Sequence, residues 1–417
     1  MTWKVFHAAD LHLGAPLQAL GTYASERSRE KIQTVRRMLT FCEEEGVDIL
    51  LLAGDIFDNV TIPPALLQEV QEMFGVLTKT KVFISPGNHD YFAIDSPYAQ
   101  PHWPDCVHIF RGKASTVLLP AQQISITGAG FEGTYQRESL LCDFDPMCGF
   151  GSIQNFGENR TEKSEVPDSS SFLHLAVLHG DLVRPGEKSN YHPIVPEAFP
   201  ADYFAYVALG HVHKRTPIQN IGKTAYAYAG CLDGAGFDET GAKGGYLLTW
   251  DGRQMQSQFL SFSSRQFHRE EIDVSEVQSR EELSARIEAR VQQFEMDAAQ
   301  TTDGVEPEAG VDTSLRTRDV QADYYRFYLI GNCEESLARR VPMLEQELRD
   351  RLYYVELFDE TQPAVNWASV RKEQNLRGFF VDALQKKIAA PGDEREKEVQ
   401  QLALRYGWQA LEGDIRL

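Results

Sequence analysis

The sequence lacks the features that build disulfide, zinc-knuckle or membrane-spanning frameworks. Its six cysteines stand at positions 42, 106, 142, 148, 231 and 333, and no two of them form a CxxC pair. That spacing argues against a disulfide framework and against a zinc knuckle, so we expect reduced thiols packed as small apolar groups. No apolar run approaches the roughly 20 residues that a helix needs to cross a bilayer.

The N-terminal stretch also lacks the layout of a signal peptide. Residues 1–6 lead directly into a strand-like pattern, without the basic, apolar and small-residue regions of a secretory leader. We therefore expect a cytoplasmic protein without membrane contact, with association with the nucleoid as an alternative.

Positive charge is scarce as well. The chain carries 41 Lys and Arg against 61 Asp and Glu, a formal net charge of −20. Because the neutralisation of phosphates drives nucleic-acid binding, proteins that hold DNA mainly by charge are usually basic. A polyanionic substrate would therefore require bound cations, a local basic patch or a partner that binds the substrate.

The chain is long enough for more than one domain. At 417 residues, two or three domains are expected, and 42% hydrophobic and 11% aromatic residues are ordinary for a globular protein with a sizeable core. We predict a first domain over 1–264, a small α+β domain over 265–360 and a helical segment over 361–417.

The first half alternates strand-like and helix-like segments, which favours an α/β layered fold. We expect strands at 4–9, 47–53, 82–85, 124–127, 173–178 and 206–209, and helices at 27–45 and 63–77. The stretch 224–262 alternates with a two-residue period between glycine turns, which predicts antiparallel hairpins. Two polar segments, 151–171 and 297–321, are predicted to be poorly ordered surface excursions.

The pattern changes near residue 265. Strand-like runs at 267–274, 324–330 and 353–358 alternate with helical runs at 279–294 and 334–348, which predicts the α+β domain. Two helices follow, with apolar stripes that either pack on their own domain or form a docking surface for a partner. The stripes are Leu376, Phe379, Phe380, Ala383 and Leu384, then Val399, Leu402, Ala403, Tyr406 and Ala410.

Five short motifs carry the chemistry, and each follows an apolar strand-like run. They are DLH at 10–12, GDIFD at 54–58, GNHD at 87–90, HGD at 179–181 and GHVH at 210–213. Loops at the carboxyl ends of strands in an α/β sheet converge on one edge, where ligand sites form. One such motif alone is more often a surface pair, but five in order, all at strand ends, indicate one site.

Seven side chains in these motifs are candidate metal ligands. Carboxylate, imidazole and amide ligands suit Mn²⁺, Fe or Zn²⁺ in five- or six-coordinate sites better than a thiolate-bound structural zinc. Seven ligands are too many for one tetrahedral ion, but they suit two ions about 3.5–4 Å apart that share a bridge and clamp a phosphate. The candidates are Asp10, His12, Asp55, Asn88, His179, His211 and His213.

With these motifs the sequence resembles the calcineurin-like metallophosphoesterase superfamily, whose pattern is D-x-H, G-D-x-x-[DH], G-N-H-[DE], H and G-H-x-H. The stretches FHAADLHLG at 6–14, YAGC at 228–231 and FDETGAKG at 237–244 resemble the SbcD-like DNA repair exonuclease branch, the nuclease subunits that work with an SMC-like ATPase. The superfamily resemblance covers about residues 1–262. It implies a four-layer α/β/β/α sandwich followed by a smaller α+β capping domain and terminal helices.

Carried over by position, the resemblance implies two metal positions. One is held by Asp10, His12, Asp55 and His213, and the other by Asp55, Asn88, His179 and His211, with Asp55 as the bridge. The expected cofactors are two divalent ions, Mn²⁺ first, with Fe, Zn²⁺ and Mg²⁺ as alternatives. The resemblance also implies DNA as substrate, an SMC-like ATPase as partner and a homodimer.

The same resemblance assigns the catalytic roles. A metal-bound hydroxide would attack phosphorus in line with the leaving group. His89 would stabilise developing charge or protonate the leaving oxygen, and Asp58 would orient His89 as an acceptor. Some nuclease members carry His at the position of Asp58, which leaves the balance of exonuclease and endonuclease activity open.

Several residues near the motifs have two interpretations. His192 is either structural or a substrate contact, and the basic run 27–37 with Lys31 is either a solvated helix face or a surface that tracks DNA or lines a dimer. Asp90 and Asp181 are expected to brace the site. For the whole chain we expect a 3′–5′ DNA exonuclease that works in a larger repair complex, and the alternative is a phosphodiesterase or phosphatase for nucleotides or other small phosphate esters.

Overall fold

The computed structural model describes residues 2–142, 144, 153–156, 172–300, 319–333, 341–363, 365, 367–390 and 393–412. The chain forms two compact units, of which one ends at Phe267 and the other begins at His268. Most of the polar segments 151–171 and 297–321 lies outside the described residues, as does Cys148. In the described part of the chain, none of the helices combines the length and apolar character needed to cross a bilayer.

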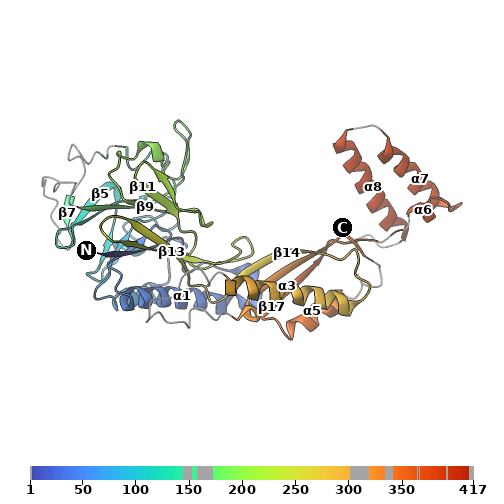
Figure 1. Cartoon of the computed structure of the whole chain (residues 1–417), viewed down its shortest axis with the longest axis horizontal. Coiled ribbons are helices and arrows are strands. Elements are labelled where there is room, and N and C mark those ends of the chain that lie inside the picture. Colours follow the sequence, from blue (N-terminus) through green and yellow to red (C-terminus); the bar gives the residue numbers. More distant parts are fainter. Residues whose placement is uncertain are drawn as a thin grey trace. The chain divides into compact units, whose positions relative to one another are not determined.

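The first unit contains a mixed sheet with six described strands (Figure 1). Parallel pairing joins β1, β2, β3 and β4, while β12 pairs antiparallel with β1 and with β13. In sheet order the strands are β13 (Met255–Ser261), β12 (Gly244–Trp250), β1 (Trp3–Ala8), β2 (Ile49–Leu52), β3 (Lys81–Ile84) and β4 (Val107–Ile109).

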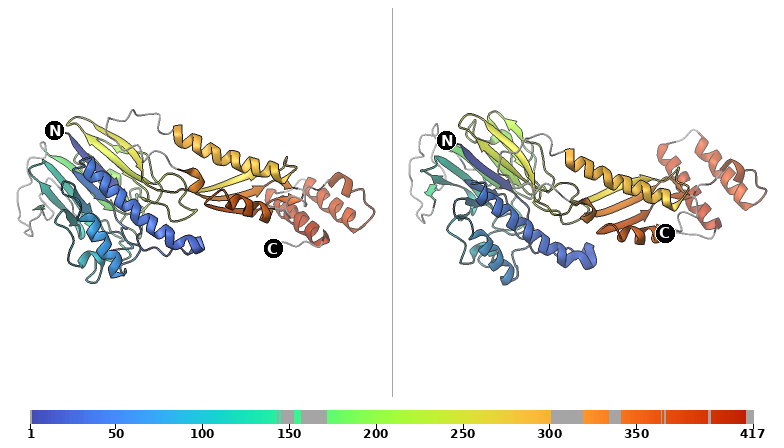
Figure 2. Two further views of the ribbon diagram at one scale, coloured as in Figure 1. Left: turned by 90° about the horizontal axis from the view of Figure 1, so that it is seen from below. Right: turned by 60° about the horizontal axis from the view of Figure 1, so that its bottom comes forward.

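Two helices cover one face of this sheet, as the turned views in Figure 2 show. They are α1 (Ala24–Glu44) and α2 (Pro64–Phe74), and both were expected from helical spacing. Met38 and Leu39 of α1 and Phe74 of α2 pack into one core with Phe6 and Leu50 of the sheet. Short 3₁₀ turns at Gln18–Tyr23, Pro97–Ala99 and Pro196–Ala198 complete the helical elements described in this unit.

A second mixed sheet, with seven described strands, packs on the other face of the first. Val5, Ile49 and Phe83 of the first sheet share a core with Val177 and Ala208 of the second. In sheet order the strands are β10 (Gln219–Ile221), β11 (Thr224–Tyr228), β9 (Tyr206–Gly210), β8 (Leu173–His179), β6 (Ile124–Gly130), β5 (Gly112–Leu119) and β7 (Ile153–Asn155).

The two sheets differ from the expectations in two respects. The predicted antiparallel pairing within 224–262 is present between β12 and β13, but β11 lies in the other sheet, where it pairs antiparallel with β10 and parallel with β9. The outer face of the second sheet packs on Leu140, Ile194 and Phe199, which lie in loops. The described residues therefore form helix, sheet and sheet layers, with loops in place of the expected fourth helical layer.

The second unit contains a three-stranded sheet of β14 (Phe267–Asp273), β15 (Tyr324–Ile330) and β17 (Tyr354–Asp359). Tyr325, Phe327 and Leu329 alternate on one face of β15, and that face packs on the buried residues of α3 (Arg280–Gln300) and α5 (Val341–Arg349). A two-stranded pair, β16 (Asn332–Cys333) and β18 (Gln362–Pro363), follows. The α+β character expected from the sequence is present.

The chain ends in a helical hairpin (Figure 1). It consists of α7 (Leu376–Ala389) and α8 (Glu394–Glu412), preceded by the short α6 (Trp367–Val370). Asn375 caps α7, because its side-chain oxygen accepts a hydrogen bond from the backbone N–H of Gly378 at 3.0 Å. Val381, Leu404 and Trp408 form a small core of their own.

Candidate metal centre

The five motifs meet at the carboxyl ends of strands from both sheets of the first unit. Asp10 and His12 follow β1, Asp55 follows β2 and Asn88 follows β3. His179 ends β8, and His211 and His213 follow β9. Backbone hydrogen bonds tie neighbouring motifs together: Asp10 N–H donates to the Gly54 carbonyl at 3.1 Å, and Gly180 N–H donates to the Gly210 carbonyl at 3.1 Å.

These side chains form three overlapping groups whose ligand atoms lie within 4.8 Å of one another. One group is Asp10, His12 and His213, and another is Asp55, His179 and His211. The third joins His12, Asp55 and His89, so Asp55 belongs to two groups. Its Oδ2 lies 3.8 Å from His12 Nε2 and 3.4 Å from His179 Nε2, which is the central place that a bridging carboxylate requires.

The first cation position lies between His12 and His213. His12 Nδ1 lies 3.1 Å from Asp58 Oδ1, and His213 Nδ1 contacts the Glu239 carboxylate. In a neutral imidazole Nδ1 is then the donor, so the lone pairs are on the two Nε2 atoms, which are 3.0 Å apart. Two nitrogens at right angles and about 2.1 Å from one ion would be about 3.0 Å apart, so this pair fits a shared cation.

The second position lies between His179, His211 and Asn88. His179 Nδ1 donates to the Ala53 carbonyl at 2.8 Å, which directs Nε2 toward Asn88 Oδ1 at 3.1 Å. His211 Nδ1 lies 3.0 Å from the same oxygen, and its Nε2 lies 3.3 Å from Asp181 Oδ1. Imidazole nitrogens that lose their protons and an amide oxygen would all offer lone pairs at this point, so this group also fits a metal ion.

All seven sequence-predicted ligands therefore lie together. Several adopt backbone conformations that non-glycine residues rarely take, with φ of 52° at Asp10, 45° at His12, 50° at Asp55 and 106° at His211. Such strain concentrates at functional sites. Close packing also requires glycine at position 87, where a Cβ atom would overlap the Asp55 carboxylate.

His89 lies beside the cluster, as expected, but Asp58 holds it differently. The exposed imidazole of His89 contacts His12 edge to face, with ring centroids 4.8 Å apart, and its Nδ1 lies 3.1 Å from the backbone carbonyl of Asp58. The Asp58 carboxylate instead faces His12. The predicted carboxylate contact with His89 is corrected to a backbone contact, because the Asp58 side chain points toward the first cation position.

The electrostatics of the cluster suit cation binding. Burial alone would lower the pKa of His179, but Asp55 and Asp10 raise it to about 9. Burial alone would raise the pKa of Asp55, but His179 and His12 hold it below its ordinary range. Metal ions compete with protons for such ligands, so bound cations would take over the charge balance that protonated imidazoles provide here.

Two acidic residues brace the motifs, as predicted. Asp90 is buried and accepts hydrogen bonds from the backbone N–H groups of Gly87 and Phe57 and from the Tyr98 hydroxyl. Burial and the Asp55 charge raise the pKa of Asp90 to about 6. The Asp181 carboxylate contacts His211, and the hydrogen bond from His211 holds its pKa below the ordinary value.

The structure bears on two of the alternatives that the sequence left open. His192 is buried, and its Nδ1 donates to the His179 carbonyl at 2.8 Å, which favours the structural interpretation of this residue. The basic residues Arg27 and Lys31 are 0% and 4% exposed and bond to the Asp233–Gly234 segment. These two residues therefore do not belong to a solvated face, whereas Arg36 of the same run is exposed and pairs with Glu69, so a surface that tracks DNA or lines a dimer stays a prediction for the rest of the run.

Glu239 is the site residue that no motif identified as functional. Its carboxylate contacts His213 and accepts a hydrogen bond from the Ala235 N–H at 2.6 Å. Burial alone would raise the pKa of Glu239, but these two bonds lower it to about 2. The only signal in the sequence was its place in FDETGAKG, far from the motif that contains His213.

The sequence model of calcineurin-like phosphoesterases matches residues 4–215, half of the 417-residue chain. The chain belongs to the calcineurin-like phosphoesterase family. The matched segment contains all seven clustered ligands, and the His/Asp cluster is the kind of centre with which this family binds two metal ions.

This phosphoesterase is similar to several known proteins. It is 25% identical over 288 residues to the uncharacterized metallophosphoesterase YhaO of Bacillus subtilis (strain 168), covering 68% of this chain and 66% of that one. It is 27% identical over 283 residues to the SbcD component of the nuclease SbcCD of the same organism, covering 59% and 68%. It is 26% identical over 306 residues to the DNA double-strand break repair protein Mre11 of Methanopyrus kandleri, covering 68% and 62%. The phosphoesterase thus spans about two thirds of the length of these relatives.

Proposed function

We propose that the chain is a two-metal phosphodiesterase that acts as a 3′–5′ DNA exonuclease in DNA repair. The observation that carries the proposal is the convergence of two imidazole–carboxylate groups on Asp55, with His89 beside them. We propose DNA as the substrate because one relative is a component of a nuclease and another is a DNA double-strand break repair protein.

Two divalent ions at these positions would polarise the scissile phosphate and lower the pKa of an attacking water to about 7. The chain's own residues supply the rest. Asp58 and Glu239 hold His12 and His213 with Nε2 toward the first cation position. His89 is fixed by its backbone N–H, which donates to Asp55 Oδ1 at 2.9 Å, and its exposed ring can donate a proton to a leaving oxygen.

The direct test uses the purified protein with Mn²⁺ on end-labelled duplex and single-stranded DNA, beside bis-p-nitrophenyl phosphate and cyclic nucleotides. We expect shortening of DNA from its 3′ ends that depends on Mn²⁺. DNA left intact, alone and with an SMC-like ATPase added, while the small diesters are cleaved would favour the alternative function, a phosphodiesterase or phosphatase for small phosphate esters. The Asp55→Ala variant is the matched control for contaminating nucleases.

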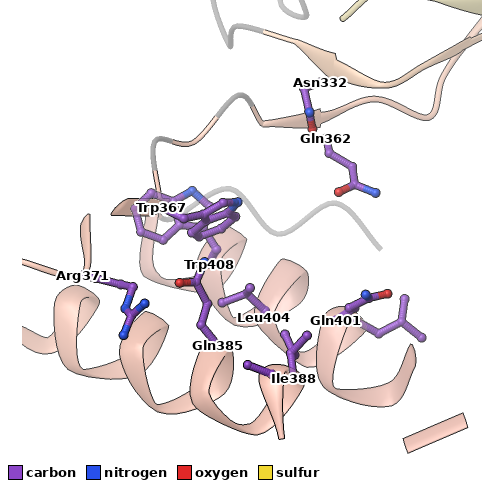
Figure 3. A pocket seen from close by; sticks show the side chains of 11 residues that line it. Asn332, Gln362, Trp367, Arg371, Gln385, Ile388, Gln401, Leu404 and Trp408 are labelled. Atoms are coloured by element: carbon purple, nitrogen blue, oxygen red, sulfur yellow. The ribbon is translucent and has the colours of Figure 1, made fainter. Parts of the chain in front are cut away.

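We also propose that the terminal hairpin docks an SMC-like ATPase. The core of the hairpin buries only part of its apolar stripe: Phe379, Val399 and Leu402 are 62%, 59% and 47% exposed. A pocket of about 900 Å³ lies beside it, and Figure 3 shows Trp367, Trp408 and Leu404 among the side chains that line it. An apolar helix face next to a groove is a common docking mode.

Binding of a purified SMC-like ATPase to the protein by titration calorimetry tests the docking proposal. Phe379→Asp and Leu402→Asp should each weaken binding at least tenfold, whereas the exposed Lys386→Asp on the same hairpin should not. Equal effects of all three substitutions would contradict it. The proposed homodimer is tested separately, by the molar mass of the protein in light scattering.

A further inference from the structure

Lys31 is a buried cation next to the metal centre. It lies on α1 with 4% of its surface exposed, and its Nζ donates to the Asp233 carbonyl at 3.3 Å. An ammonium group has three donors, and among the described residues no carboxylate oxygen lies within 4.0 Å of this one. A buried ammonium that makes one long hydrogen bond is costly unless a further acceptor is supplied.

Two acidic residues beside Lys31 already bind other groups through their carboxylates. Asp233 binds Arg27 through Oδ1 and the Thr34 hydroxyl through Oδ2 at 2.6 Å. Glu239 binds His213 through Oε1 and the Ala235 N–H through Oε2. The acidic groups around Lys31 are therefore bound to other residues, which leaves its remaining donors for another group.

Those donors adjoin a pocket beside the first cation position, whereas His179 and His211 of the second position do not line it. Lys31 lines it together with Asp10, His12, His89 and His213. Its volume of about 160 Å³ exceeds several times the ~30 Å³ of one water, and it is smaller than the ~300 Å³ or more of typical small-molecule sites. The pocket thus has room for one phosphate group of a substrate whose scissile phosphate lies at the metals.

We propose that Lys31 binds the phosphate of the nucleotide next to the scissile bond. This inference rests on the proposed nuclease function and specifies its substrate: a chain of phosphodiesters, recognised by two phosphates at once. It would also allow a chain of net charge −20 to bind a polyanion, because one buried lysine and two bound metal ions would supply positive charge at the pocket.

The test compares nucleoside 3′,5′-bisphosphate with the 3′- and 5′-monophosphates by calorimetry on the Mn²⁺-loaded protein. We expect the bisphosphate to bind wild type about tenfold more tightly than either monophosphate, as a charge-assisted hydrogen bond would give. Lys31→Met should remove this gain and leave the tighter monophosphate within about twofold of wild type. Lys31→Arg should keep most of it.

Lys243→Met is the matched control. Lys243 is also buried, at 9% exposure, and its Nζ makes one long bond, 3.4 Å to the His213 carbonyl, but it does not line the pocket. The Lys243→Met variant should keep the full gain in affinity that the second phosphate gives. The proposal is overturned if wild type gains nothing from the second phosphate, or if Lys31→Met weakens all three ligands alike. Failure of the protein to degrade DNA would instead count against the nuclease function, whatever this binding experiment gives.

Discussion

His213 lies between Glu239 and His12. Its Nδ1 contacts the Glu239 carboxylate, and its Nε2 lies 3.0 Å from His12 Nε2. The carboxylate fixes the imidazole tautomer that presents a lone pair to the first cation position. Carboxylates that hold metal-binding imidazoles in this way commonly change metal affinity by about 10–100-fold when they are removed.

Glu239→Gln should therefore weaken one of two Mn²⁺ binding events. The glutamine oxygen can still accept from the Ala235 N–H, but its amide then faces Nδ1 and favours the tautomer with a protonated Nε2. We expect about 10–100-fold weaker binding at one site and little change at the other. Calorimetric Mn²⁺ titration measures both. Glu132→Gln, which removes an exposed carboxylate paired with Arg111, is the control; equal loss in both variants would contradict the role of Glu239.

His89→Gln should separate catalysis from metal binding. His89 contacts the cluster but is not required by either imidazole pair, so the variant should still bind two Mn²⁺ ions. Loss of a proton donor commonly costs about 10²–10⁴ in kcat. Steady-state hydrolysis of a diester with a poor leaving group should show this loss most clearly. Unchanged kcat for that substrate would remove His89 from the mechanism.

His108 should make stability depend on pH. Burial lowers its pKa to about 4, below the value of about 6.5 expected in the unfolded chain. The native state then binds fewer protons, so its stability is fully present above about pH 6.5 and falls as pH drops toward 4. The ring of His108→Phe would pack beside Phe110. Between pH 7 and pH 5 the free energy of unfolding of this variant should fall by about 2 kcal/mol less than that of wild type. If wild type and His108→Phe lose the same free energy of unfolding between pH 7 and pH 5, the role of His108 is contradicted.

Arg27 should be worth far more to stability than an exposed arginine. Its guanidinium is fully buried and binds Asp233, Glu30 and the Gly234 carbonyl. Breaking a buried pair by removing one partner costs about 3–5 kcal/mol, whereas the exposed Arg111–Glu132 pair should contribute about 0–1 kcal/mol. Urea unfolding of Arg27→Met and Arg111→Met compares the two. Equal destabilisation would show that the Asp233 network does not hold α1 in place.

The sequence predicted the positions of helices and strands better than the pairing between strands. Apolar periodicity located the strand Tyr324–Ile330 without error and placed α1 within a few residues. It could not show that β11 and β12 belong to different sheets, because a two-residue period is the same whichever strand lies alongside. Nor could it show that loops cover the second sheet, since loop packing leaves no period.

The site residues that stand in short sequence motifs could be predicted. Contacts between residues from distant segments could not. The seven ligands stand in short motifs after strands, so their convergence followed from the topology. Glu239 meets His213 from a separate loop, and Asp233 meets Arg27 from across the chain, so no spacing marks either pair. The sequence also could not show that the Asp58 carboxylate faces His12 and not His89, because spacing along the chain does not set the direction of a side chain.

The claim on which the account depends is that Asp55 is shared by two metal ions. The most direct measurement is the number of Mn²⁺ ions bound per chain in wild type and Asp55→Ala, by elemental analysis after equilibrium dialysis, with bis-p-nitrophenyl phosphate hydrolysis in parallel. The account predicts two ions in wild type, at most one weakly held in the variant, and a loss of hydrolysis of at least about 10³-fold. A wild-type chain that binds one ion, or a variant that keeps both ions and full hydrolysis, would contradict it.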